Sequence, residues 1–64
     1  MQQEEENALP ESRRREVFLA LVAAQDRGMS APLSRKVIAT QFHLTDVQVR
    51  QIEQEGLDHD WPPL

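Results

Sequence analysis

The chain has 64 residues, a net charge of −4 and no cysteine. A chain of this length predicts one small domain, which buries only about 60% of the surface that its unfolded form exposes. Without cysteine there is no disulfide, thiolate metal site or thiol nucleophile, and two glycines are too few for a phosphate-cradling loop. The longest apolar run, residues 17–24, is too short to span a bilayer, so we expect a cytoplasmic protein without membrane contact.

The charge is distributed unevenly along the chain. Residues 1–11 carry four acidic side chains and no basic one, and residues 51–64 do the same. Residues 12–50 carry seven Lys or Arg against three acids, which leaves a net charge of +4. Attraction to phosphate depends on the local field, so a basic middle can bind a polyanion although the whole chain is acidic.

The first predicted helix covers about residues 10–26. Residues 1–8 before it are polar and acidic, and we expect a disordered tail there. Pro10 suits a first helical turn, and Gly28 is typical of the position just after a helix. One apolar stripe is formed by Val17, Phe18, Leu21 and Val22, with Gln25 at its end. Apolar residues outside this stripe exceed what one neighbouring helix covers; they are Leu19, Ala20 and Ala23. The other two helices could shield them, but we expect a second copy of the chain or another protein over this helix.

Two further helices are predicted at residues 31–42 and 46–56. Ser30 is a good N-cap and Pro32 is tolerated in the first turn, while Thr45 and Gln48 have the spacing of a capping box. Gly56 either ends the last helix or is a weak point inside it. The side chains expected in the core are Leu33, Val37, Ile38, Ala39, Phe42, Val49 and Ile52.

The sequence therefore predicts an all-α fold, a small three-helix helix-turn-helix domain at residues 9–57 with an extended C-terminal tail at residues 58–64. Ala39 is small enough for the two motif helices to cross closely, and His43 in the turn is expected to have a positive φ. In the tail, two prolines favour an extended backbone. Trp61 and Leu64 are expected to cover the core; an anchor for another protein is the alternative. If the last helix continues past Gly56, Leu57 and Trp61 lie on one face of it.

The second helix of such a motif enters the major groove and reads bases with its outward side chains. The predicted base contacts are Asp46, Val47, Gln48, Arg50, Gln51 and Gln54. The predicted phosphate contacts are Arg13, Arg14, Arg15, Arg35, Lys36 and Thr45. Arg pairs with guanine, Gln with adenine and Val with a thymine methyl, whereas a carboxylate such as Asp46 repels phosphate unless it accepts from a cytosine amine.

Other site types find little support in the sequence. His59 lies between Asp58 and Asp60, but three adjacent side chains do not easily converge on one metal ion. No nucleophile, base and orienting partner stand out. We therefore expect no metal, no cofactor and no enzymatic activity.

Residues 49–57, VRQIEQEGL, resemble the promoter-reading region-four helix of bacterial housekeeping sigma factors, and the resemblance covers about residues 33–57. Residues 50–53 match the family's Arg-Gln-Ile-Glu run, which implies that Arg50 and Gln51 contact DNA. The family usually has a basic and then an acidic residue where this chain has Asp46 and Val47, which implies a different base sequence. At this length we do not expect a complete sigma factor, which also grips polymerase and melts a promoter.

The sequence thus predicts a protein that binds double-stranded DNA, as a small transcription regulator or a DNA-reading subunit. The alternative is a protein–protein interaction module. In that interpretation the apolar helix at residues 10–26 and the WPPL tail bind a partner, and the acidic ends repel DNA.

Overall fold

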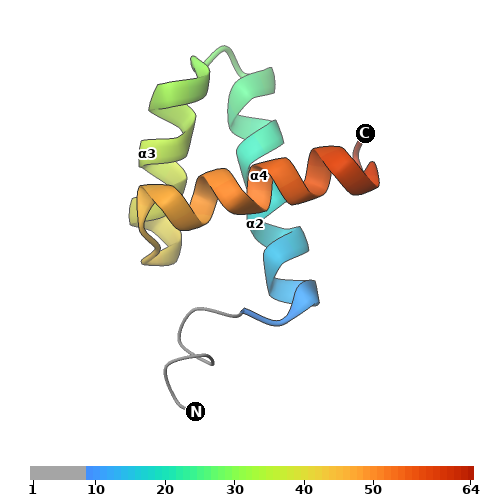
Figure 1. The fold of residues 1–64 in the computed structure, drawn as a ribbon. Helices are drawn as coiled ribbons and strands as arrows, with labels where there is room; N and C mark the ends of the chain where they lie inside the picture. The colour runs from blue at the N-terminus through green and yellow to red at the C-terminus, as the bar shows by residue number, and fades with distance from the viewer. Residues whose placement is uncertain (1–8) are drawn as a thin grey trace.

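The computed structural model describes residues 9–64, which form three helices (Figure 1). Helix α2 spans Glu11–Asp26, α3 spans Ala31–Phe42 and α4 spans Asp46–His59, and residues 9–64 contain no strand. Helices α2 and α3 run side by side, and α4 crosses both, so that each helix packs on the other two (Figure 1). The predicted all-α three-helix fold is confirmed. The disorder expected at residues 1–8 lies outside the described residues.

The helix ends follow the local signals in the sequence. The Ser30 hydroxyl accepts from the Leu33 backbone N–H at 3.3 Å and caps α3. At the start of α4 the Thr45 hydroxyl accepts from the Gln48 N–H at 3.1 Å, and the Gln48 side chain accepts from the Thr45 N–H at 2.8 Å. Gly28 and His43 have φ values of 105° and 59° where α2 and α3 end. The capping box and the positive φ of His43 are therefore confirmed, and Gly28 follows the end of α2 as expected.

The core lies where the three helices meet. Its buried apolar side chains are Val17, Phe18, Leu21, Ala24, Ile38, Ala39, Val49, Ile52 and Trp61. Phe42 and Val22 are half-buried against this core. The expected core positions on α4, and most of those on α2, are thus confirmed.

Two expected core residues of α3 are exposed instead. Leu33 is 49% exposed and Val37 is 37% exposed. The face of α3 that packs inward is centred on Ser34 and Ile38, because the small Ser34 side chain is fully buried and its hydroxyl donates to the Ala31 carbonyl at 2.8 Å. Burying the Ser34 hydroxyl costs little free energy because it is hydrogen-bonded within its own helix. With Ser34 in the core, the inward face of α3 turns away from the larger side chains of Leu33 and Val37.

Gly56 lies inside α4, and this helix continues to His59. The expected end of the helix at residue 56 is wrong, and the alternative, a glycine within the helix, is what the structure has. A Cβ at Gly56 would overlap ring atoms of Phe18. The glycine therefore permits a closer approach of α4 to α2 than any other residue would allow.

The tail after α4 turns back onto the core. Asp60 has a φ of 52° and ends the helix, and the Trp61 N–H donates to the Gly56 carbonyl at 3.0 Å. The Trp61 ring is 4% exposed and meets the Phe18 ring edge to face, with 6.0 Å between the centroids. Trp61 therefore covers the core as expected, whereas Leu64, expected to share this role, is exposed.

Two other expectations for the tail are wrong. Leu57 is 50% exposed and does not share a face with Trp61, because the left-handed residue at position 60 takes the chain out of helical register. The last residues also bend instead of extending, since the Leu64 N–H donates to the Trp61 carbonyl at 3.0 Å.

Replacing Gly56 with Ala tests the close approach of α4 to α2. Alanine is favoured over glycine in a helix by about 1 kcal/mol, but forcing a methyl group into a filled site costs about 1–3 kcal/mol. Because ring atoms lie where the methyl must go, the cost should fall in the upper part of this range, so we expect a net loss of about 1–2 kcal/mol in the free energy of unfolding, measured by urea denaturation. In the Phe18→Leu background the loss should shrink. A Gly56→Ala variant as stable as the wild type would contradict the proposed contact.

The buried indole can be tested against the exposed side chain at the end of the chain. Removing a buried Trp costs about 3–5 kcal/mol, which equals the whole stability expected of a domain of this size. We expect Trp61→Ala to abolish the cooperative thermal transition seen by circular dichroism. Leu64→Ala is the control, and it should melt as the wild type does because Leu64 is 59% exposed. Equal melting of both variants would show that Trp61 does not belong to the core.

Candidate nucleic-acid interface

The outward face of α4 carries a shallow hollow. Val49, Ile52 and Gly56 are the buried residues of this helix, so the side chains opposite to them face solvent. The hollow there has a volume of about 450 Å³. It is lined by Arg35, Val47, Arg50, Gln51, Glu53 and Gln54. Four of the six predicted base-contacting residues, and one predicted phosphate contact from α3, are therefore brought together.

The other two predicted base contacts lie beside this hollow. Asp46 is exposed, and its carboxylate lies 3.9 Å from the Arg50 guanidinium. Both side chains are more than half exposed, so this pair contributes little and leaves the Arg50 donors accessible. Gln48 is half-buried, and its side-chain oxygen is already used in the capping box with Thr45. Its amide nitrogen is in no such bond and remains for a ligand.

Arg35 reaches the hollow from α3. Its Nε donates to a Glu53 carboxylate oxygen at 2.8 Å, and its side chain is partly buried. The other Glu53 oxygen accepts from the Gln25 side chain of α2 at 3.4 Å. Lys36 is exposed on α3 and does not line the hollow.

The three consecutive arginines of α2 point to three different partners. Successive helical residues are about 100° apart, so they cannot share one face. Arg13 pairs with Glu16 at 2.6 Å, and its guanidinium lies 4.9 Å from the centroid of the Phe42 ring. Arg15 pairs with Glu11 at 2.8 Å, and its guanidinium lies 5.1 Å from the centroid of the Trp61 ring. The predicted basic cluster is thus not one surface.

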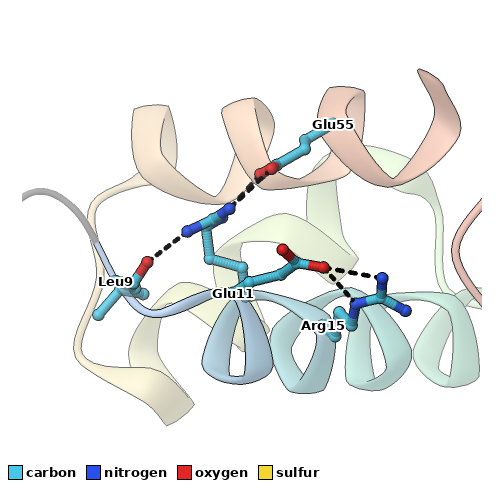
Figure 2. Close-up of polar contacts among 5 residues, drawn as sticks. Leu9, Glu11, Arg15 and Glu55 are labelled. Carbon is cyan, nitrogen blue, oxygen red and sulfur yellow. Dashed lines mark hydrogen bonds and ion pairs between the residues drawn. The ribbon is translucent and has the colours of Figure 1, made fainter. Parts of the chain in front are cut away.

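Arg14 is bound most completely of the three. Its Nε and Nη2 donate to the two oxygens of Glu55 on α4 at 2.8 and 2.9 Å, and its Nη1 donates to the Leu9 carbonyl (Figure 2). Hydrogen bonding to Glu55 raises the pKa of Arg14 above its usual value. Figure 2 also shows the pair between Glu11 and Arg15, in which the Arg15 hydrogen bond lowers the pKa of Glu11. Arg14 joins the two helices, and each of its three guanidinium nitrogens is already bonded within the chain.

The partners of these arginines were not predicted from the sequence. Glu53 and Glu55 were assigned to an acidic end segment, but both lie on α4 and bind arginines of α3 and α2. Gln25, expected at the end of an apolar stripe, bonds to Ser34 and Glu53. The only signal was opposite charge, which does not specify pairs that are 18 and 41 residues apart.

Other kinds of site have little basis in the part of the chain that the structure describes. Residues 9–64 contain no group of three His, Cys, Asp or Glu side chains that could hold a metal ion. His59 is exposed and stacks on the Trp61 ring, with 6.3 Å between the centroids. None of the helices formed by these residues has the length and apolar character needed to cross a bilayer. No protein-family model, curated protein or solved structure matches the chain.

Replacing Thr45 with Ala tests the capping box that starts α4. The variant loses the hydroxyl that accepts from the Gln48 N–H, and such changes cost about 0.5–2 kcal/mol. We expect a loss of about 1 kcal/mol in the free energy of unfolding, measured in urea. Thr40→Ala is the matched control, because Thr40 is exposed within α3 and alanine favours a helix. If the two variants were equally stable, the Thr45 hydroxyl would have no stabilising role as the cap of α4.

Proposed function

We propose that this protein binds double-stranded DNA, with α4 in the major groove, as a small transcription regulator or the DNA-reading subunit of a larger assembly. One observation carries the proposal: Arg35, Val47, Arg50, Gln51 and Gln54 share the outward hollow of the second helix of a helix-turn-helix. The resemblance of residues 33–57 to region four of sigma factors supports the same placement.

The side chains of the hollow suit base recognition. Arg50 is 63% exposed at its side chain and can donate two hydrogen bonds to a guanine edge. Gln51 and Gln54 can pair with adenine, and the exposed Val47 can contact a thymine methyl. Each good pair of this kind discriminates against a wrong base by about 1–3 kcal/mol. Together they are enough for a short sequence preference.

Phosphate binding rests on few cations. Arg13, Arg14 and Arg15 lie on α2 and pair with carboxylates. The cations of α3 and α4 are Arg35, Lys36 and Arg50, of which Arg35 and Arg50 also meet a carboxylate. In a plot of the logarithm of the DNA-binding constant against the logarithm of the salt concentration, each phosphate that the protein neutralises contributes about −0.9 to the slope. We therefore expect weak binding by one copy and a salt slope of about −3 at most.

The test is selection of bound duplexes from a randomised DNA library, followed by titration of the selected duplex. The double variant Arg50→Ala, Gln51→Ala should lose the preference and at least tenfold in affinity, because two base contacts are removed. Arg27→Ala is the control for charge, since Arg27 follows α2 and does not line the hollow. It should keep the preference. Selection of no sequence by the wild type, or an unaltered preference in the double variant, would refute the proposal.

A second candidate function is binding of another protein, or of a second copy of the chain, through α2. Leu19 is 52% exposed on α2, and a mainly apolar hollow of about 300 Å³ lies between it and the prolines of the tail. Trp61 is buried and cannot be the anchor of such an interface. In this interpretation the DNA library yields no preferred sequence, and Arg50→Ala, Gln51→Ala has no effect on function.

A further inference from the structure

We infer that Glu53 is a positioning residue, which orients the Arg35 guanidinium so that its Nη groups hold a DNA phosphate at the edge of the α4 hollow. The inference rests on the proposed function and adds to it an acidic residue that promotes DNA binding. It follows from a comparison of Arg14 and Arg35, the two arginines of other helices that pair with glutamates of α4.

The two arginines use their donors differently. Arg14 donates from all three guanidinium nitrogens, two to Glu55 and one to the Leu9 carbonyl. Within residues 9–64, Arg35 donates only from Nε, to Glu53, and its two Nη groups bond to no protein atom. A guanidinium presents its Nη donors in a fixed plane that matches phosphate. Arg35 is thus bound at one edge and free at the other.

Glu53 is itself held in place from a third helix. Its side chain is 17% exposed, one oxygen accepts from Arg35, and the other accepts from Gln25 of α2. The same Gln25 nitrogen lies 3.1 Å from the buried Ser34 hydroxyl, directly before Arg35 in α3. Gln25 of α2, held by Ser34 of α3, therefore restricts the Glu53 side chain, and Glu53 in turn restricts the orientation of the Arg35 guanidinium. An arginine ordered before binding loses less side-chain entropy when it contacts a ligand.

Charge alone predicts the opposite effect. Glu53 lines the hollow, and a carboxylate near DNA repels phosphate, so its removal should tighten binding. If Glu53 orients Arg35, its removal should weaken binding, because Arg35 then samples many rotamers. The sign of the change in affinity separates the two interpretations.

The experiment compares Glu53→Gln with Glu55→Gln. Each variant removes one negative charge from α4 and breaks one Arg–Glu pair, but only the first releases Arg35. We expect Glu55→Gln to bind the selected duplex as tightly as the wild type or more tightly. Glu53→Gln should bind about tenfold more weakly, with a salt slope smaller by about 0.9. Circular dichroism melting of both variants is the check that each is folded before the affinities are compared.

Two further measurements complete the test. In the Arg35→Gln background, Glu53→Gln should have no additional effect on affinity. In NMR spectra of the free protein, the Arg35 Nε–H signal should be protected from exchange in the wild type and in Glu55→Gln, but not in Glu53→Gln. Equal DNA affinity of the two Gln variants, or an Arg35 signal unchanged by Glu53→Gln, would overturn the inference while leaving the proposed function intact. Absence of DNA binding by the wild type would overturn the proposed function and, with it, the phosphate contact.

Discussion

The contact between Gly56 and the Phe18 ring determines how the three helices fit together. Because Gly56 has no Cβ, α4 lies directly against the Phe18 ring. The Gly56 carbonyl also accepts a hydrogen bond from the Trp61 N–H. This brings the indole against Phe18 and completes a core that a chain of this size could not otherwise close. The direction of α4, and with it the placement of the outward face, depends on this one close approach.

Two Arg–Glu pairs also join α4 to its neighbours, one to α2 and one to α3. Arg14 of α2 binds Glu55, and Arg35 of α3 binds Glu53. All four side chains are partly buried, where an ion pair contributes more than at a fully exposed position but is still opposed by lost hydration. The geometry of the pairs differs, since all three guanidinium nitrogens of Arg14 donate within the chain and only the Nε of Arg35 does so within residues 9–64. The Arg14–Glu55 pair joins α2 to α4. The Arg35–Glu53 pair joins α3 to α4 and also leaves the Nη donors of Arg35 at the edge of the candidate DNA-reading surface.

The pairing also changes the meaning of charge along this chain. A basic middle and two acidic ends suggested a cationic surface, but Glu11, Glu16, Glu53 and Glu55 each neutralise an arginine. The field that DNA would meet therefore comes from a few residues of α3 and α4. In the proposed complex, recognition through Arg50, Gln51 and Gln54 would depend more on base contacts than on phosphate attraction, and we expect selective but weak binding by one copy.

The sequence by itself determined the helices and their starts, because caps, turn residues and apolar spacing act over three or four residues. Ser30, Gly28, His43 and the Thr45–Gln48 box behave as their local chemistry predicts. It also placed four side chains of the hollow on one face of α4, since a helix has a fixed period. Only the tertiary structure decided that α4 continues past Gly56, that Ser34 replaces Leu33 and Val37 in the core, and which glutamate each arginine binds. These outcomes depend on steric fit and charge pairing between segments far apart in the chain, which local patterns do not encode.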